Sequence, residues 1–343
     1  RCRHFGVCGG CHYQNLAYAD QLALKRELVC DQLRRVGGFR DAPVQPVRPS
    51  PQEWGYRNAV QFHLNEDGRL GFQRMQSNQV TPIVECHLPM APIQEIWPQM
   101  EMDAPLGEER IHLRCNAEGE VLIGLETAAG ASAPELVLES GVSVVHFSPA
   151  GSSVLAGEDG LIFRVLERDF RVSAASFFQV NLAQTEQMLR LVMDFSPPSG
   201  GTLVDLYCGV GLFTAFLASR FQQVIAVELS ESACQDFAEN LDEFEQVSLY
   251  MGAAEQVLPA LDLAEVDTVV VDPPRAGLDR RALDAVLQIH PRQIISISCD
   301  PASFARDAKL ICQAGYRLST VVPVDMFPQT YHIETVSLFE RAE

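Results

Sequence analysis

The sequence predicts an α/β protein in which a β-rich domain precedes a doubly wound domain with a mostly parallel sheet. From about residue 173, short apolar runs alternate with helical patterns, which is typical of parallel βα units. Between residues 56 and 171 the apolar runs are short and alternating, with turn signals such as Asp67-Gly68 between them. A length of 343 residues and a hydrophobic content of 47% are enough for two or three domains and a large core.

The N-terminal part divides into a loop and a helix. Residues 1–14 are rich in cysteine and glycine and predict a loop wrapped around a bound group. Residues 15–38 predict a basic helix packed between domains, with its helical part over 17–36 and a stop at Gly37 and Gly38. The predicted apolar stripe consists of Leu22, Val29, Leu33 and Val36, and the charge elsewhere on the helix comes from Lys25, Arg26, Arg34 and Arg35.

The rest of the chain forms two predicted domains, 39–172 and 173–343. Residues 39–52 contain four prolines and predict a linker, which leads into strands near 59–64, 70–73, 111–115, 121–125, 143–147 and 161–165. In the second domain a helix is predicted over 181–195 and strands over 202–206, 224–227, 268–271, 294–297 and 335–339. No internal repeat is present.

Charge and cysteine content narrow the class of protein. The net charge is −19, but residues 1–50 carry eight Lys/Arg against four Asp/Glu, so phosphate binding is expected in the N-terminal part. The ten cysteines lack the dense spacing of a small secreted domain, which favours metal-binding or catalytic thiols in a reducing compartment, the cytoplasm. No run of eighteen apolar residues and no signal-peptide core is found, so no membrane association is predicted.

A glycine turn follows the first strand of the second domain. Asp205 precedes it, Gly209 and Gly211 let the backbone approach a ligand, and Thr214 replaces the third glycine of a dinucleotide-binding turn. Glu228 follows the next strand at the distance that suits hydrogen bonds to a ribose diol. The pattern resembles the Rossmann-like S-adenosylmethionine methyltransferases.

Three further side chains lie directly before or after predicted strands. Asp272 lies in a stiff Asp-Pro-Pro-Arg loop, Cys299 ends an apolar run, and Glu334 comes thirty-five residues later. A thiolate can add to carbon 6 of a uracil ring, which makes carbon 5 nucleophilic towards a methyl sulfonium; a base then removes the carbon-5 proton. His332 is an alternative base, or a histidine that fixes the loop.

Five motifs, in this order, resemble those of the RNA uracil-5-methyltransferases. They are Ser-Phe-Phe-Gln-Val-Asn at 176–181, the glycine turn, Asp-Pro-Pro-Arg-Ala-Gly at 272–277, Ser-Cys-Asp-Pro at 298–301 and Met-Phe-Pro-Gln-Thr-x-His-x-Glu at 326–334. The resemblance implies transfer of a methyl group from S-adenosylmethionine to carbon 5 of a uridine in transfer or ribosomal RNA. It implies Cys299 as nucleophile, Glu334 as base, and a cofactor site lined by Gln179, Tyr207, Glu228 and Asp272. Gly209 and Gly211 of the glycine turn are expected to bind the same cofactor.

The chain departs from its relatives in two places. Leu212 stands where some relatives have Asn, which puts one cofactor contact in doubt. Many relatives begin with a small β-barrel RNA-binding domain, the TRAM domain, and this sequence starts where that domain would end.

Cys2, Cys8 and Cys11 are spaced C-x5-C-x2-C, and a fourth ligand must come from elsewhere. Four thiolates can hold a [4Fe–4S] cluster or a structural zinc ion, and the spacing does not choose between them. The family resemblance implies Cys86 as the fourth cysteine and favours the iron–sulfur cluster. Methyl transfer needs no electron, so the expected role is structural or RNA-positioning.

A uracil must be flipped out or unpaired before a thiol can reach carbon 6. Phe177 is a candidate for stacking on the base or for the core, and Arg57 for a phosphate contact. RNA is the expected partner of a monomeric enzyme. The alternatives are an RNA methyltransferase acting on cytosine carbon 5 or on an amine, and a non-catalytic RNA-binding protein with a metal cluster.

Overall fold

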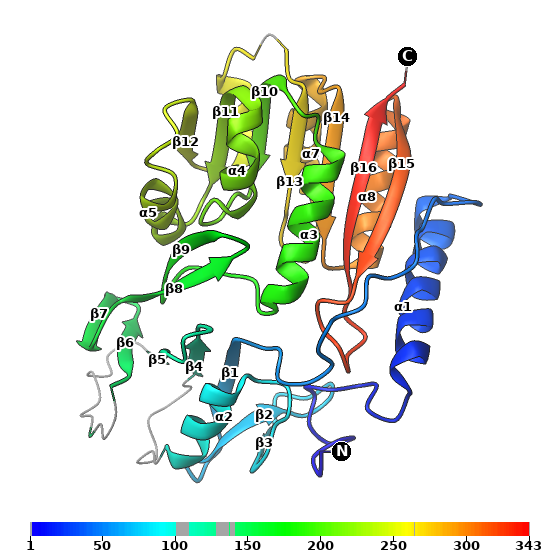
Figure 1. Cartoon of the computed structure of the whole chain (residues 1–343). Coiled ribbons are helices and arrows are strands. Elements are labelled where there is room, and N and C mark those ends of the chain that lie inside the picture. Colours follow the sequence, from blue (N-terminus) through cyan, green and yellow to red (C-terminus); the bar gives the residue numbers. More distant parts are fainter. Residues whose placement is uncertain (1, 101–109, 128–136, 138–140, 264, 343) are drawn as a thin grey trace.

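The computed structural model describes residues 2–100, 110–127, 137, 141–263 and 265–342. Its larger part is a seven-stranded sheet in the order β12-β11-β10-β13-β14-β16-β15 (Figure 1). The strands are β10 (Gly200–Leu206), β11 (Phe221–Glu228), β12 (Val247–Met251), β13 (Thr268–Val271), β14 (Gln293–Ser298), β15 (Tyr316–Val324) and β16 (Glu334–Arg341). The first five are parallel, and β16 runs antiparallel to both of its neighbours. The predicted α/β fold class is confirmed.

Helices cover both faces of this sheet. On one face, apolar residues of β10, β11 and β14 pack with α3 (Leu182–Phe195), α4 (Leu212–Leu217) and α5 (Glu231–Asn240). The opposite face packs against α1 (Tyr18–Gln32), α6 (Ala254–Val257), α7 (Arg280–Gln288) and α8 (Pro301–Gln313). The alternation of side chains along each strand supplies an apolar set to each face, as a doubly covered sheet requires.

The smaller part is a second seven-stranded sheet in the order β3-β2-β1-β4-β5-β6-β7. Its strands are β1 (Ala59–Leu64), β2 (Leu70–Gln73), β3 (Val80–Pro82), β4 (Arg110–Cys115), β5 (Val121–Glu126), β6 (Ser143–Ser148) and β7 (Gly151–Ala156). Phe62, Ile111 and Leu113 pack beneath α2 (Ala91–Ile96). Residues 101–109, 128–136 and 138–140 of the predicted 39–172 domain lie outside the described residues.

The hairpin of β8 (Gly160–Val165) and β9 (Arg168–Ser173) forms a sheet of its own. Its buried Phe163, Phe170 and Val172 belong to the core of the larger part, together with α3. The hairpin therefore packs with the domain that follows the predicted boundary at 172, and Leu122 of β5 in the first sheet joins the same core.

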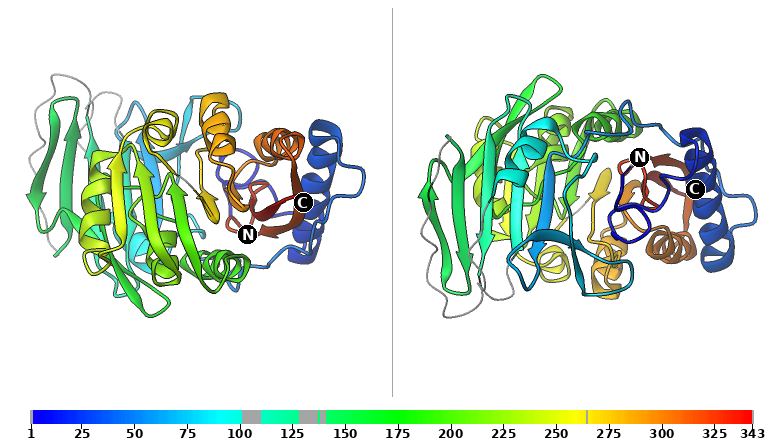
Figure 2. Two further views of the ribbon diagram at one scale, coloured as in Figure 1. Left: turned by 90° about the horizontal axis from the view of Figure 1, so that it is seen from above. Right: turned by 90° about the horizontal axis from the view of Figure 1, so that it is seen from below.

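The N-terminal helix differs from its prediction in the burial of two residues. Val29 and Leu33 are buried as expected, whereas Val36 is exposed and Lys25, predicted to lie on the charged surface, is completely buried. α1 contacts α8 and β15 of the larger domain, and both views of Figure 2 show it along this outer end of the sheet. Lys25 is buried because it pairs with Asp325, a residue that no local pattern connects to the helix.

The proline-rich segment predicted as a linker covers the open edge of β15. Gln45 and Arg48 donate backbone N–H groups to the carbonyls of Val321 and Pro323, both at 2.8 Å. Pro323 is tolerated there because β15 is an edge strand. Within the described residues, no helix is long and apolar enough to cross a membrane.

Candidate active site

A cavity of about 1290 Å³ lies at the carboxyl ends of β10, β11, β13 and β14. Parallel strands bring the loops that follow them to one sheet edge, so residues distant in sequence meet there. Of the residues predicted for cofactor binding and catalysis, the cavity is lined by Gln179, Tyr207, Gly209, Glu228, Asp272, Cys299 and Glu334. Phe177 and Arg57 line it as well.

The two glycines of the turn have different structural roles. Gly209 has a φ of +54°, and no heavy atom lies within 4 Å of the position that a Cβ would take, so its backbone is open to a ligand. Gly211 has a φ of +89°, and its Cβ would lie 2.2 Å from Cδ1 of Leu241. Gly211 does not line the cavity; it permits close packing of the turn on α5 and the segment after it. Tyr207 also adopts a left-handed conformation, at φ +60°, which marks this turn as strained.

Glu228 ties the glycine turn to the loop after β11. Its carboxylate accepts N–H groups from Gly209 at 2.9 Å, Leu229 at 2.7 Å and Ser230 at 2.8 Å. A carboxylate has about four lone-pair sites, so one remains for a hydroxyl of a ribose. The side chain is thus held firmly at the position expected for a ribose contact.

Asp205 lies below the turn and is almost completely buried. The Thr214 hydroxyl donates to its Oδ2, while its Oδ1 has no hydrogen-bond partner. Burial raises the pKa of Asp205 to about 7. Thr214, which stands where a dinucleotide-binding turn has glycine, therefore serves to anchor this carboxyl group.

Asp272 and Gln179 meet in the lining of the same cavity. The Gln179 amide donates to Oδ2 of Asp272 at 3.5 Å. Burial raises the pKa of Asp272 to about 7. An anionic Asp272 here would be stabilised by a cation, such as a ligand that carries a sulfonium or an amino group.

Cys299 and Glu334 lie across from each other at the end of β14 and the start of β16. These strands are antiparallel, and their register pairs Ser298 with Thr335, which sets Cys299 opposite Glu334. Burial, together with the charges of Glu334 and Asp272, raises the pKa of the Cys299 thiol to about 12, and Arg275 opposes this shift. Burial also raises the pKa of Glu334 well above its usual range, with Asp272 adding to the shift.

Cys299 is followed directly by a helix N-terminus. Asp300 caps α8 by accepting N–H groups from Ala302 at 3.1 Å and Ser303 at 2.9 Å. The positive end of the helix dipole favours a thiolate at this position, which partly opposes the effect of burial.

His332, the alternative base, does not line this cavity. Its ring faces the cavity of the N-terminal cysteines and lies 4.3 Å from the Tyr331 ring, centroid to centroid. Burial lowers the pKa of His332 to about 4, and Arg275 adds to this effect. The structure thus agrees with a histidine that fixes the loop.

Phe177 and Phe178 face in different directions. Phe177 is 71% exposed at the cavity, whereas Phe178 is buried, with its ring 5.0 Å from that of Phe163. Phe177 is therefore not a core residue. Arg57 lines both cavities, and its buried Nε has no hydrogen-bond partner.

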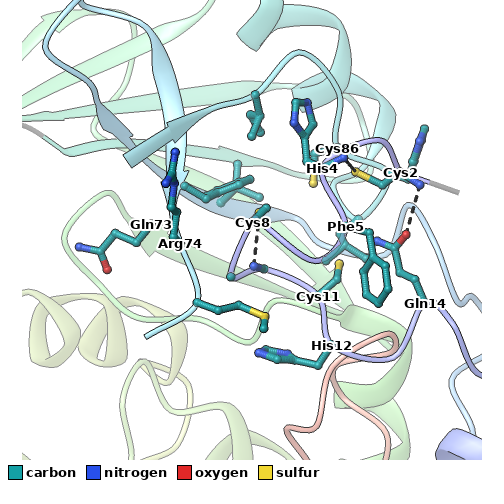
Figure 3. Close-up of a pocket in the computed structure, with 18 of the residues that line it drawn as sticks. Cys2, His4, Phe5, Cys8, Cys11, His12, Gln14, Gln73, Arg74 and Cys86 are labelled. Atoms are coloured by element: carbon teal, nitrogen blue, oxygen red, sulfur yellow. Dashed lines mark hydrogen bonds between the residues drawn. The ribbon is translucent and has the colours of Figure 1, made fainter. Parts of the chain in front are cut away.

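The four predicted ligand cysteines line one cavity of about 560 Å³ (Figure 3). They come from the N-terminal loop (Cys2, Cys8 and Cys11) and from the segment after β3 (Cys86). Backbone N–H groups of His4 and Gly10 donate to the sulfurs of Cys2 and Cys8, each at 3.4 Å. Among the described residues, no group of three or more His, Cys, Asp or Glu side chains has the geometry to hold a metal ion.

Sequence reasoning missed three residues near the catalytic pair. Arg275 and Phe327 line the cavity, and Lys25 is bound to the loop that ends at Glu334. One signal was available for Lys25, since it is one of only two lysines in a chain with 26 basic residues.

An open, mostly parallel sheet, a glycine turn bound to Glu228 and a cavity at the strand ends define the class of S-adenosylmethionine-dependent methyltransferases. Gly209 leaves open space towards the cavity, so the residues present fit such a cofactor.

Comparisons with known proteins refine this class. The model of the tRNA (Uracil-5-)-methyltransferase family matches residues 161–342. An RNA methyltransferase of Streptomyces avermitilis is 32% identical over 98% of this chain and 81% of its own length, and one of Aquifex aeolicus is 33% identical over 99% and 83%. The crystal structure of Pyrococcus abyssi tRNA (uracil-54, C5)-methyltransferase with S-adenosyl-L-homocysteine has a TM-score of 0.75 at 27% identity, covering 97% of this chain and 84% of that one.

The chain belongs to the tRNA (uracil-5-)-methyltransferase family. It is an S-adenosylmethionine-dependent RNA methyltransferase, which confirms the resemblance noted in the sequence.

Proposed function

We propose that the protein methylates carbon 5 of one specific uridine in transfer or ribosomal RNA, with Cys299 as nucleophile and Glu334 as base. One observation carries this proposal: the β14–β16 register sets the thiol opposite the carboxyl group within the cavity that also holds the glycine turn. A thiol and a carboxyl group on one side of a cofactor site are what covalent activation of a pyrimidine ring requires.

The chain's own residues account for the proton and bond changes. The Cys299 thiolate adds to carbon 6, and carbon 5 becomes the nucleophile. S-adenosylmethionine supplies the methyl group to carbon 5 and leaves as the neutral thioether. Glu334 then takes the carbon-5 proton, the Cys299–carbon-6 bond breaks, and the thiolate is regenerated with the 5-methyluridine product.

The electrostatics of the pair suit these roles. The raised pKa of Glu334 makes its carboxylate a stronger proton acceptor than an exposed one. The raised pKa of Cys299 means that the resting enzyme carries a thiol. A sulfonium charge nearby and the start of α8 both favour the thiolate, so we expect the nucleophile to form only in the loaded site.

For the target base, we propose that Phe177 stacks on the flipped ring. It is exposed at the mouth of the cavity that holds Cys299, and an aromatic face suits an unstacked base. Arg57, with its unpartnered Nε, is our candidate for the adjoining phosphate.

We further propose that Cys2, Cys8, Cys11 and Cys86 hold a [4Fe–4S] cluster rather than zinc. The four thiols line one cavity, so one bound group could reach all of them, and the family resemblance favours the cluster over zinc. Two sulfurs already accept backbone N–H groups, as cluster thiolates do. None of the ten cysteines is in a disulfide, which suits a reducing compartment.

Labelled S-adenosylmethionine with unmodified transfer RNA and ribosomal RNA tests the main proposal. Digestion and mass spectrometry should identify 5-methyluridine from one of the two RNAs, with none formed by Cys299→Ala. Cys312→Ala, at the far end of α8, is the matched control and should remain active. Full activity of Cys299→Ala, or a methylated cytosine or amine, would contradict the proposal.

Iron and sulfide content after anaerobic purification tests the cluster, and stoichiometric zinc instead would refute it.

A further inference from the structure

The loop between β15 and β16 runs through residues 325–333 and ends at Glu334. Figure 1 shows it projecting from the sheet towards the N-terminal segment. We propose that a buried ion pair between Lys25 and Asp325 positions this loop, and that Lys25 is thereby a positioning residue for Glu334. The inference deepens the proposed function, because it rests on the role of Glu334 as base.

Lys25 is an unusual residue in this chain. Only two of its 26 basic residues are lysines, and the other, Lys309, is exposed on α8. The side chains of Lys25 and Asp325 are both 0% exposed. The Lys25 ammonium binds Oδ1 of Asp325 and donates to the carbonyl of Phe327 at 3.0 Å. It therefore grips the first three residues of the loop.

Two other residues of α1 also bind the 325–333 loop. The Tyr18 hydroxyl donates to Oδ2 of Asp325 at 2.7 Å, which fills the second oxygen of the carboxylate. The Gln21 amide exchanges two hydrogen bonds with Gln329, both at 3.1 Å. Residues 18, 21 and 25 lie on one face of a helix, so one rigid element holds the loop at two points.

The N-terminal segment before α1 also binds the 325–333 loop. Backbone N–H groups of His12 and Tyr13 donate to the carbonyl of Gln329 at 2.8 and 3.0 Å, next to the cysteine ligand candidates. Gln329 itself has a φ of +69°, a conformation that a non-glycine residue keeps only when its surroundings enforce it. The segment before Glu334 is therefore held in a conformation that it would not adopt alone.

A gain in stability is a poor explanation for this pair. Desolvation of two charges offsets much of their attraction, so an apolar pair of similar volume stabilises a core equally well. Val29 in the next turn of the same helix, and Leu33 directly after the helix, are packed in that apolar way. An ion pair differs from an apolar contact because its bonds are directional. The Lys25 ammonium fixes Asp325 and the Phe327 carbonyl at defined positions, and Phe327 lines the cavity together with Glu334.

The first test compares Lys25→Met with wild type and with the matched control Lys309→Met, using the full chain without RNA. Hydrogen exchange of a peptide over residues 325–333 should become faster in Lys25→Met only, while the glycine-turn peptide and the affinity for S-adenosylmethionine stay unchanged. Tyr18→Phe, a milder change that keeps the ring, should give a smaller increase. Exchange in Lys25→Met and Tyr18→Phe equal to that in wild type would overturn the proposal.

The second test follows the covalent enzyme–RNA adduct on denaturing gels, with transcribed transfer and ribosomal RNA and S-adenosylmethionine. If Glu334 is displaced, proton removal slows and the methylated adduct accumulates; a shift of about 1 Å costs on the order of 100-fold in rate. Lys25→Met should accumulate adduct, as Glu334→Gln does, and Lys309→Met should not. Loss of stability alone would lower adduct and product together.

The two proposals fail in different ways. If Glu334→Gln turns over normally, the base assignment is wrong, whatever Lys25 does. If Glu334→Gln accumulates adduct and Lys25→Met releases product at the wild-type rate, the base assignment holds and the positioning role of Lys25 is refuted.

Discussion

Cys299 and Glu334 are neighbours across two antiparallel strands although thirty-five positions separate them in the chain. The pairing of Ser298 with Thr335 sets this relationship, and the reversed direction of β16 makes it possible. In a wholly parallel sheet the start of the last strand would lie at the opposite edge from the end of β14. The antiparallel direction of β16 thus places the Glu334 carboxyl group at the sheet edge where the cofactor-binding loops lie.

We expect Glu334→Gln to add to RNA and to transfer the methyl group, but to release product slowly. Glutamine keeps the shape of the side chain and cannot accept the carbon-5 proton, so elimination stalls. The covalent adduct should be visible on a denaturing gel and absent when Cys299→Ala is combined with it. Release at the wild-type rate would assign the base elsewhere.

We expect Glu334→Gln and Asp272→Asn each to lower the pKa of Cys299. Both carboxylates raise that pKa, so removal of either charge increases the thiolate fraction at a fixed pH. Each unit of pKa is worth about tenfold in thiolate at a pH well below the pKa. Iodoacetamide labelling at mildly alkaline pH, followed at Cys299 by mass spectrometry, should be faster in both variants. Labelling of Cys312 in the same samples is the internal control, and unchanged Cys299 rates would contradict the prediction.

The buried Asp205 predicts a pH-dependent difference in stability. Its pKa rises from 3.8 in the unfolded chain to about 7 in the folded one, so its contribution is complete below pH 4 and is lost as the pH rises to 7. The upper limit of that loss is on the order of 4 kcal/mol. Asp205→Asn should therefore gain stability relative to wild type between pH 4 and 7, measured by denaturant unfolding. The exposed Asp262→Asn is the matched control; a constant difference for Asp205→Asn across this range would contradict the assignment.

The two glycines of the turn should respond differently to alanine. Gly211→Ala places a methyl group against Leu241 and Phe237, which costs about 1–3 kcal/mol of unfolding free energy besides the backbone strain. Gly209→Ala meets no protein atom and should cost only about 1–2 kcal/mol, from its positive φ. Its methyl group faces the cavity, so binding of S-adenosylmethionine should weaken more in Gly209→Ala. Equal effects on stability and binding in the two variants would contradict this division.

Phe177→Ala should weaken RNA binding without affecting the cofactor. Base–aromatic stacking is worth about 1–3 kcal/mol per base, and Phe177 makes no contribution to the core. Phe177→Tyr keeps the ring and should bind RNA as wild type does. The exposed Ile162→Ala controls for loss of surface apolar area. Normal RNA affinity of Phe177→Ala in filter binding would remove Phe177 from the substrate site.

The sequence predicted the strands that carry the site well, because their apolar runs are local signals. The range 268–271 agrees with β13, and the predicted cores of β10, β11 and β14 lie within longer strands. β12 and β15 were not predicted. β12 is an edge strand with a largely exposed pattern, and β15 contains Pro323, so neither has the continuous apolar run of a central strand.

By itself, the sequence determined the α/β class, the family and the chemical groups of the site, because motif residues and their order are properties of the chain. Only the tertiary structure decided how these groups are used. It separated Gly209 from Gly211, turned His332 away from the catalytic cavity and exposed Phe177 while burying Phe178. It also placed Lys25 in the interior, since the partner that compensates its charge is 300 residues away. A buried charge is stable only beside such a partner, and spatial proximity of distant residues is set by packing rather than by local pattern.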